Sequence, residues 1–419
     1  MDNNSSGSSQ ATIKESNLAL IIKTIHRHSV CSRAQLARET GLGQSSITKI
    51  VNILIEWGMV QEVGILSEAL SIDTGAGRKP TGITLVCQKY TFMAMRVNRN
   101  YVKAAIYDIA GTCYCQLERA ISASQGAQFA VEELIKLGKE LISSCTCNMP
   151  MAIGVALPGP FDARHGRITL MSGFPGWESI DLKNMLENSF SLPVFLEHDA
   201  NCGALAEWWF GRYSRRENML FIAADRGIGA GIIANGNIYR GQLGSAGEIG
   251  HLSIHFNGAR CECGNRGCLE LYASTKTLVE TYEQAVFEEG KDCPLPSPVT
   301  AELIYEAVRN GDNTACACYS KIVRLLAFGL VGIINTLNPD TVVFGDHIID
   351  GGDLFLLVIR ETLQKHLLKE VYDNLTLCTS SFTDPMLFGA SALAFDKLLM
   401  QPSYNFRNAE LDTIIATQT

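Results

Sequence analysis

Apolar residues near the start of the chain recur at the spacing of one helix face. Leu18, Ile21, Ile22 and Ile25 repeat three and four residues apart, which predicts an amphipathic helix. The residues before it, "MDNNSSGSSQATIKES", are rich in Ser, Asn and Gly. We therefore expect a flexible arm over residues 1–16 and a folded domain that begins after it.

Two further short helices follow, separated by a turn that contains glycine. Ser32 begins a capping-box pattern, S-R-A-Q, for a helix that Gly41 ends. After "GLGQ", the stretch "SSITKIVNILIEWG" predicts a third helix that Gly58 ends. The residues expected on its buried face are Ile47, Ile50, Val51 and Leu54. Two short helices joined by such a turn are typical of a helix-turn-helix.

Strand-like alternation then replaces the helical spacing. "MVQEVGI" (59–65) alternates like a strand, a loop ends in "GAGRKP" (75–80), and "TGITLVC" predicts a second strand. Three helices followed by a hairpin favour a winged helix-turn-helix DNA-binding domain over residues 17–86. A small helical oligomerisation domain is the alternative.

Candidate DNA-contacting residues are polar and basic side chains at the start of the third helix and in the hairpin loop. Those in the helix, suited to phosphates and to base edges in a major groove, are Gln44, Ser45, Ser46, Thr48 and Lys49. Those in the loop, suited to the DNA backbone or a minor groove, are Arg78 and Lys79. A solvated loop tip would have a similar composition.

From about residue 91 onward, strand patterns alternate with helical ones. "FMAMRVN", "YVKAAIYDIAG", a helix over 126–144, "MAIGVALPGP", "PVFLEHDAN", a helix from Cys202, "MLFIAAD" and "GAGIIANG" follow in turn. Two such halves, the second ending in "PDTVVFGDH", predict a two-lobed α/β body with a cleft between the lobes. We place the lobes at residues 87–200 and 201–385. A C-terminal helix and tail (386–419) return to the first lobe.

Composition supports a large folded protein outside the membrane. The chain has 419 residues, of which 47% are hydrophobic and 19% charged, so it can bury more than one core. Apolar runs such as "LLAFGLVGIINTL" (325–337) are shorter than the roughly 18 residues of a membrane span. The N-terminus also lacks the apolar segment of a secretory signal. We expect a cytoplasmic protein without membrane insertion.

The charge is distributed unevenly between the two parts. Residues 1–80 hold 8 Lys and Arg against 7 Asp and Glu, whereas residues 81–419 hold 27 against 36. Because the body is acidic, it would repel nucleic acid, and only the N-terminal domain is suited to contact it. When bound to DNA, the protein would be associated with the nucleoid.

A cluster of metal-binding residue types lies in "GHLSIHFNGARCECGNRGCLE" (250–270). Its spacing, H-x9-C-x-C-x4-C, is formed by His251, Cys261, Cys263 and Cys268. One imidazole and three thiolates form a closed tetrahedral set, which is typical of structural Zn²⁺. A disulfide and unliganded reduced cysteines are the alternatives, and the expected compartment disfavours the first.

Other cysteines of the chain carry a weaker signal. Most lie singly in apolar stretches, as buried reduced thiols do. Two C-x-C pairs have no nearby histidine and are interpreted as ordinary thiols rather than metal ligands: Cys113/Cys115 and Cys145/Cys147.

Together with its flanks, the cysteine motif resembles the signature of the ROK family, which joins sugar kinases with sugar-operon repressors. The matching stretch is "GEIGHLSIHFNGARCECGNRGCLELYAS". Further blocks occur in the expected order: "GVALPGPFD", "SGFPGWESIDLKNMLE", "LPVFLEHDANCGALAE", "GIGAGIIANGNIYRGQLGSAGEIGH" and "LNPDTVVFGD". The N-terminal domain is similar to that of the repressor branch, which includes regulators of glucose, N-acetylglucosamine and xylose genes.

This resemblance implies a fold and a sugar site. The body would have the actin-like ATPase (ribonuclease H-like) fold, with the sugar held between two α/β lobes. Asp199 falls at the catalytic base of the kinases, and His198 stands where they have Asn. The sugar hydroxyls would be bound by Glu248, His251 and Glu270. Carboxylates and an imidazole suit vicinal hydroxyls, and a zinc-bound His251 would be held in one orientation.

Taken without the resemblance, Asp199 would be interpreted as an ordinary helix N-cap.

The nucleotide motifs of the kinases are altered in this chain. The first, D-x-G-G-T, corresponds to "RVNRN", which places Arg96 at the Asp, Asn98 and Arg99 at the two Gly and Asn100 at the Thr. The second, G-T-G-x-G-x-G, corresponds to "DRGIGAG" (225–231), and the adenine loop to "GDH" (345–347). A phosphate site needs small residues and an acidic anchor for Mg²⁺. We therefore expect no ATP binding and no kinase activity.

These features together predict a transcriptional regulator of sugar genes, with a repressor favoured. Its expected partners are a double-stranded DNA operator, a sugar or sugar-phosphate inducer and further copies of the chain, as a homodimer or tetramer. Two alternatives remain: a bifunctional or residual sugar kinase, and a regulator controlled by a sugar-phosphotransferase protein instead of a small ligand.

Overall fold

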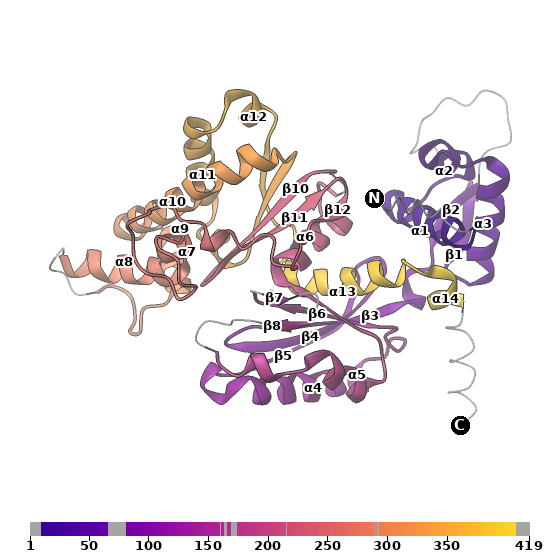
Figure 1. Cartoon of the computed structure of the whole chain (residues 1–419), viewed down its shortest axis with the longest axis horizontal. Coiled ribbons are helices and arrows are strands. Elements are labelled where there is room, and N and C mark those ends of the chain that lie inside the picture. The colour runs from indigo at the N-terminus through magenta and orange to yellow at the C-terminus, as the bar shows by residue number, and fades with distance from the viewer. Residues whose placement is uncertain are drawn as a thin grey trace, which may run out of the picture.

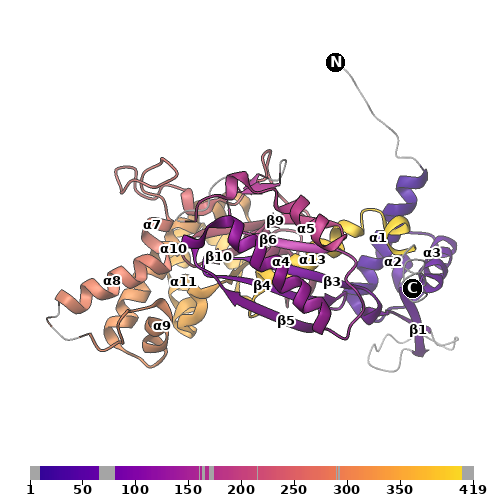
Figure 2. The ribbon, with the colours of Figure 1, turned by 90° about the horizontal axis from the view of Figure 1, so that it is seen from below.

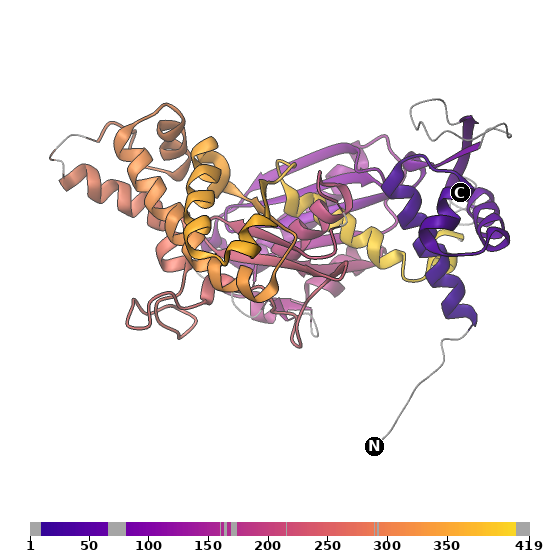
Figure 3. The same cartoon turned by 90° about the horizontal axis from the view of Figure 1, so that it is seen from above.

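The protein consists of an N-terminal head and two α/β lobes arranged along an elongated molecule (Figure 1). The head lies at one end and helices α8 (Thr275–Glu288) and α9 (Ala301–Arg309) at the other, as two further views show (Figure 2, Figure 3). The computed structural model describes residues 10–65, 81–159, 161–162, 166–168, 174–214, 216–288, 290 and 293–407.

Three helices and a two-stranded antiparallel sheet form the head. In chain order these are α1 (Gln10–His28), α2 (Arg33–Thr40), α3 (Gln44–Glu56), β1 (Val60–Ile65) and β2 (Thr81–Leu85). The apolar face predicted for α3 is buried, and Gly41 ends α2 with a left-handed φ of 71°. The Ser32 side chain accepts a hydrogen bond from the backbone N–H of Gln35 (3.1 Å). The Gln35 side chain instead donates to Glu39, so only half of the predicted capping box forms.

The first helix begins earlier than the sequence pattern indicated. We expected a flexible arm over residues 1–16, but α1 starts at Gln10. Its first turns are exposed or only partly buried, because the buried face begins at Leu18. Hydrophobic spacing detects only the part of a helix that packs, so it missed the exposed turns at the N-terminus.

A five-stranded mixed sheet in the order β5-β4-β3-β6-β9 forms the first lobe. Its strands are β3 (Thr91–Val97), β4 (Tyr101–Asp108), β5 (Cys113–Ala120), β6 (Ile153–Leu157) and β9 (Val194–His198), with β7 (Phe161–Asp162) and β8 (Arg167–Ile168) as a separate short pair. Helices α4 (Gly126–Ser144) and α5 (Leu182–Phe190) pack against one face. Met93 and Met95 point into that core. Both faces of β3 are buried, which explains its continuous apolar run.

A second five-stranded sheet, in the order β12-β11-β10-β13-β14, forms the other lobe. Its strands are β10 (Met219–Ala224), β11 (Ile228–Ala234), β12 (Asn237–Ile238), β13 (Thr341–Gly345) and β14 (Thr376–Thr379). Its other helices are α7 (Glu270–Ala273), α10 (Asn313–Leu337), α11 (Asp353–His366) and α12 (Lys369–Asp373). The core of the lobe lies between the sheet and these helices.

One described helix, α10, is long and apolar enough to cross a membrane by length and composition alone. Its apolar stretch is therefore longer than the run 325–337 indicated. A row of its side chains, including Ile322, Leu326, Leu330 and Ile334, is buried in the core of the second lobe. This burial accounts for the hydropathy of α10 within a folded lobe.

Two helices lie side by side between the sheets: α6 (Asp199–Phe210) and α13 (Pro385–Leu398). They approach so closely that a Cβ on Gly389 would stand 1.7 Å from the carbonyl oxygen of Cys202, so only glycine fits there. The sequence pattern had placed the start of α6 at Cys202 instead of Asp199. The last described element is α14 (Pro402–Arg407), which lies beside the head (Figure 1).

The head and the first lobe share one hydrophobic core. Side chains of the head, such as Leu18 and Ile25, belong to the same cluster as Phe92, Trp209 and Phe395 of the body. A salt bridge between Lys23 and Asp396 (2.9 Å) joins α1 to α13 at its edge. The head is thus packed onto the body instead of being held only by a linker.

Candidate functional site

A polar cleft opens between the two lobes. It is lined by β3, by the start of α6 and by segments of the second lobe, and its hollow, together with the adjoining open solvent, measures about 820 Å³. All five residues predicted to bind sugar line this cleft: His198, Asp199, Glu248, His251 and Glu270. The fold therefore brings together side chains that lie more than 70 positions apart in the sequence.

His198 and Asp199 lie next to each other at the junction of β9 and α6. His198 ends β9 and is buried, and its Nε2 lies 3.4 Å from Asp199 Oδ1 and 3.8 Å from Glu248 Oε1. Asp199 is the first residue of α6 and His198 is its N-cap, so the alternative interpretation of Asp199 as the N-cap is wrong. Burial raises the pKa of Glu248, although His198 and His251 act in the opposite direction.

Space for a ligand beside these groups depends on Gly159. A Cβ at this position would lie 2.3 Å from Glu248 Oε1 and 2.6 Å from His198 Nε2. Those distances are far below van der Waals contact, so any side chain would displace both groups from the cleft.

A buried carboxylate that the sequence analysis missed holds this junction in place. Glu197 accepts hydrogen bonds from the backbone N–H of His198 (3.1 Å) and from the Asn201 side chain (3.0 Å). Its other oxygen accepts from Arg240 Nε of the second lobe at 2.7 Å. Buried carboxylates are stable only when paired and hydrogen-bonded. A lone Glu at the end of a strand pattern was the only signal in the sequence.

The four predicted metal ligands converge on one point. Their ligand atoms, from His251, Cys261, Cys263 and Cys268, all lie within 4.8 Å of one another. Cys263 Sγ and Cys268 Sγ are 3.6 Å apart, and Cys261 Sγ is 3.8 Å from His251 Nδ1. Zn–S bonds of about 2.3 Å in a tetrahedron place sulfur atoms roughly 3.7 Å apart, so the residues fit a zinc ion.

This cluster adjoins the sugar-site candidates directly. His251 contributes both to the cluster and to the lining of the cleft. Its Nδ1 faces Cys261 and lies 3.6 Å from Glu270 Oε1. A metal bound at Nδ1 would leave Nε2 as the ring nitrogen available to a ligand.

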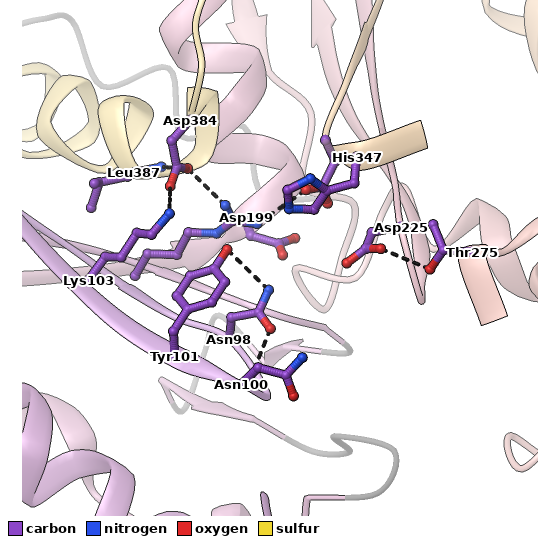
Figure 4. A network of polar contacts seen from close by, with 12 residues as sticks. Asn98, Asn100, Tyr101, Lys103, Asp199, Asp225, Thr275, His347, Asp384 and Leu387 are labelled. Carbon is purple, nitrogen blue, oxygen red and sulfur yellow. Dashed lines mark hydrogen bonds and ion pairs between the residues drawn. The ribbon is translucent and has the colours of Figure 1, made fainter. Parts of the chain in front are cut away.

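The segment expected to replace the phosphate motif of the kinases carries a buried ion-pair network (Figure 4). Arg96 lies two residues after Ala94, so their side chains share one face of β3. Ala94 packs against α13 on that face, and the Arg96 side chain points toward the start of this helix. There Asp384, the N-cap of α13, accepts from Arg96 Nη1 (2.8 Å), from Lys103 Nζ (3.2 Å) and from the backbone N–H of Leu387 (3.0 Å). Burial raises the pKa of Asp384, but the charges of Arg96 and Lys103 hold it below its usual value.

From the second lobe, a second acid closes the network. Asp346 lies in the loop after β13 with a strained φ of 64°, and its Oδ1 is 3.7 Å from Arg96 Nη2. Burial raises the pKa of Asp346 to about 7, although the charge of Arg96 opposes this shift. Asp225 from the adjacent loop accepts a hydrogen bond from Thr275 (2.9 Å). Charged side chains from both lobes therefore line this part of the cleft.

Five of the seven DNA-contact candidates lie where the sequence placed them. They are all exposed and stand in the first turns of α3: Gln44, Ser45, Ser46, Thr48 and Lys49. Thr48 donates to the carbonyl of Gln44 at 2.9 Å, so its hydroxyl is partly engaged within the helix. Arg78 and Lys79 lie outside the described residues.

A two-lobed α/β body with a polar interlobe cleft and an adjoining Cys/His cluster defines the class of this protein. The family model described as the ROK family matches residues 93–397, and the chain belongs to this family.

Relatives with assigned functions are similar over nearly the whole chain. The xylose repressor of Bacillus subtilis (strain 168) is 29% identical over 93% of this chain and 97% of its own length. The DNA-binding transcriptional dual regulator NagC of Escherichia coli (strain K12) is 29% identical over 91% of this chain and 92% of its own.

Two of the similar solved structures match different shares of the chain. A ROK family transcriptional regulator, a homologue of the E. coli MLC protein, covers 94% of this chain and 98% of its own, with a TM-score of 0.77 and 26% identity. The ROK hexokinase of Thermus thermophilus covers 74% of this chain and 99% of its own, with a TM-score of 0.60 and 25% identity. The regulator therefore matches more of this chain than the kinase does.

Proposed function

We propose that this protein is a DNA-binding transcriptional regulator, most simply a repressor, of genes for sugar uptake or metabolism. The observation that carries the proposal is the buried Arg96–Asp384 ion pair in a ROK body that also bears an N-terminal head. In this proposal the ion pair takes the place of the nucleotide phosphates, and the head contacts DNA. The named repressors and the regulator structure support the same conclusion.

In this proposal the head is a winged helix-turn-helix. The turn between α2 and α3, the exposed polar start of α3 and the antiparallel β1–β2 pair support this assignment. Two heads of a homodimer, or of a tetramer, would bind a two-fold-symmetric operator in successive major grooves. The protein would act in the cytoplasm, at the DNA.

The interlobe cleft would bind the inducer, a sugar or a sugar phosphate. Asp199, Glu248 and Glu270 would accept hydrogen bonds from sugar hydroxyls, and the His198 and His251 rings would complete the lining. The relatives are named for different sugars, so they do not identify which sugar binds here.

A structural Zn²⁺ would be held by His251, Cys261, Cys263 and Cys268, and it would fix the loop that carries part of the cleft wall. We expect about one zinc per chain by elemental mass spectrometry after purification. Cys263→Ser should lose the metal, and the exposed Cys293→Ser should keep it. Equal metal contents in the two variants would refute the assignment.

No enzymatic activity belongs to the proposed function. Arg96 puts a cation where an acidic group would have to hold Mg²⁺, and its ion pairs occupy the phosphate space. A residual kinase is the alternative, because Asp199 still lines the cleft. Incubation with aldoses, ATP and Mg²⁺ should release no ADP above the protein-free rate. Release that Asp199→Asn abolishes would establish the kinase instead.

Signal transfer would run along α6 and α13. Helix α6 begins at Asp199, which lines the cleft, and α13 begins after its N-cap Asp384, which pairs with the cleft residue Arg96. Both helices end near the head. There the His26 ring of α1 lies 5.0 Å, between ring centroids, from both Trp209 and Phe210 of α6. An inducer that binds more tightly to a different arrangement of the lobes would shift the population away from the DNA-binding state.

The DNA claim is tested by selection from a library of random duplexes with the full-length protein. Enrichment of a two-fold-symmetric motif is expected, and Lys49→Ala should weaken binding to it and lower the salt dependence. Glu56→Ala, at the other end of α3, is the matched control and should bind as the wild type does. Failure to enrich any motif would refute the regulator.

A thermal-shift and calorimetry panel of aldoses, N-acetylated sugars and their 6-phosphates tests the ligand. One member should stabilise the protein, and Glu248→Gln should remove that effect. If no member of the panel binds while DNA binding is intact, control by a sugar-phosphotransferase protein would be favoured.

A further inference from the structure

The fold brings together two C-x-C pairs that are distant in the sequence. Cys113 and Cys115 lie on β5, the edge strand of the first sheet. Cys145 directly follows α4 as its C-cap, and Cys147 comes two residues later. The side chains of Cys115, Cys145 and Cys147 are partly buried against the core of the first lobe. None of the contacts proposed for DNA, sugar or zinc uses these residues.

Cys145 is the central thiol of this group. Its Sγ lies 3.0 Å from Cys147 Sγ, and it also forms a side-chain hydrogen bond with Cys115. Burial raises the pKa of Cys145, but hydrogen bonds from these two thiols and from the backbone N–H groups of Thr146 and Cys147 outweigh it and lower the pKa. The negative end of the α4 dipole acts against a thiolate here, and the four donors overcome it.

Its two neighbours have the opposite tendency. Burial, together with the hydrogen bond to Cys145, raises the pKa of Cys147 to about 12, and the pKa of Cys115 is raised for the same reasons. The group therefore places one thiol with a lowered pKa beside two thiols with raised pKa values. A thiolate is the reactive form of cysteine, and a protonated thiol beside it can complete a disulfide.

The arrangement differs from the Cys/His cluster of the second lobe. Among the described residues, only that cluster has three or more ligand atoms that all lie within 4.8 Å of one another. The Sγ atoms of Cys115, Cys145 and Cys147 do not form such a closed group. This geometry suits pairwise bond formation better than enclosure of a metal ion.

We propose that Cys145 is an oxidation site, at which hydrogen peroxide converts Cys145 and a thiol in contact with it, most directly Cys147, into a disulfide. The thiolate sulfur attacks one peroxide oxygen, the O–O bond breaks, and hydroxide leaves and takes up a proton as water. Cys145 is then a sulfenic acid, oxidised by two electrons. The second thiol attacks its sulfur, the S–S bond forms, and the hydroxyl leaves with the thiol proton as a second water.

This site adjoins the connection between head and body. Asn148, one residue after Cys147, donates to the backbone carbonyls of Gln88 (3.0 Å) and Lys89 (3.3 Å), and its own carbonyl accepts from Thr91 (2.8 Å). Residues 88–91 link β2 of the head to β3 of the first lobe. A disulfide two residues away would change the backbone that holds this link.

Differential thiol labelling tests the chemistry on the full-length, metal-loaded protein. Free thiols are blocked after brief exposure to hydrogen peroxide, disulfides are then reduced, and the new thiols receive a second label that peptide mass spectrometry locates. We expect the second label on Cys145 together with Cys147 or Cys115. Cys145→Ser should slow labelling of the partner by about tenfold or more, and Cys113→Ser, the matched neighbour, should leave it unchanged.

Two results would overturn the proposal. One is that Cys145 does not receive the second label, or that the partner cysteine receives it as fast in Cys145→Ser as in the wild type. The other is a second zinc equivalent that the wild type holds and Cys145→Ser lacks, since that would make the group a metal site.

The effect on the head rests on the proposed DNA-binding function and has a separate readout. Peroxide should change the DNA affinity of the wild type by about threefold or more relative to the Cys145→Ser/Cys147→Ser double variant, which retains the zinc cysteines. Identical responses would refute the link to the head while leaving the labelling result intact. Loss of DNA binding by the untreated, reduced protein would instead refute the proposed function.

Discussion

At the scale of single residues, buried charges distinguish this cleft from an ordinary surface groove. Arg96 is 3% exposed and Glu197 2%, and each is paired across elements that are distant in the sequence. Such pairs are costly to break, because the remaining partner is left charged and buried. Both residues therefore fix how the lobes meet as well as what the cleft can bind.

Replacing Arg96 tests this dependence. Arg96→Ala leaves Asp384 with Lys103 alone and removes the cation beside Asp346, and we expect a loss of about 3–5 kcal/mol in the free energy of unfolding. Urea denaturation measures the change. Arg119→Ala, which breaks two more exposed ion pairs of the same lobe, with Glu133 and Glu140, should cost less than about 1 kcal/mol. Equal losses for the two variants would contradict the role of the buried network.

The buried Asp346 should make the stability of the folded protein depend on pH. Its pKa of about 7 in the folded protein lies above the value in the unfolded chain, so the folded state holds the proton more tightly. This contribution is fully present below about pH 4 and is lost as the pH rises through 7. The free energy of unfolding of Asp346→Asn, which resembles the neutral acid, should therefore rise relative to that of the wild type by up to roughly 4 kcal/mol between pH 4 and 8. Chemical denaturation at several pH values measures this change. A difference in the free energy of unfolding between the two proteins that stays constant from pH 4 to 8 would contradict the raised pKa of Asp346.

At the scale of secondary-structure elements, α6 and α13 connect the cleft to the head. Helix α6 begins with the cleft residue Asp199, and the N-cap of α13, Asp384, pairs with the cleft residue Arg96. Both helices end against α1, and glycine allows their backbones to pack without intervening side chains. The His26 ring contacts the end of α6, and its Nε2 donates to the carbonyl of Ile109 (2.9 Å). A movement of α6 at the cleft would therefore reach the head directly.

Removing that contact should uncouple the two ends. His26→Ala should retain DNA binding but reduce the effect of the inducer on DNA affinity by about fivefold or more. Fluorescence anisotropy with labelled DNA, with and without the inducer, measures both quantities. His28→Ala is the matched control on the same helix, because its contact with Glu39 stays within the head. A full inducer response in His26→Ala would exclude this route.

At the scale of the whole molecule, the head and the body stabilise each other through a shared hydrophobic core. The shared core includes Tyr90, Phe92, Trp209 and Phe395, which would become exposed without the head. A fragment comprising residues 87–419 should therefore melt at least about 5 °C below the full chain, or aggregate, in differential scanning calorimetry. Lys49→Ala, which alters only the exposed face of the head, should melt with the wild type. A fragment as stable as the full chain would show that the shared core contributes nothing.

The local patterns of the sequence determined much of this protein. Helical spacing identified the buried face of α3, and the H-x9-C-x-C-x4-C spacing identified four residues that the fold brings within 4.8 Å of one another. Family blocks identified five residues that line one cleft. These predictions succeeded because spacing along the chain sets the direction of nearby side chains, and because each block carries its own local structure.

Tertiary structure alone decided the remaining features. The sequence shows that Arg96 replaces an acid, but only the fold places Asp384, 288 positions away, within hydrogen-bonding distance of it. It likewise joins two C-x-C pairs that read as unrelated thiols, and packs the head into the core of the first lobe. Contacts between distant segments depend on how sheets and helices stack, and no periodicity along the chain records that stacking. The sequence determined which chemical groups are present, and packing between distant elements decided which of them face one another.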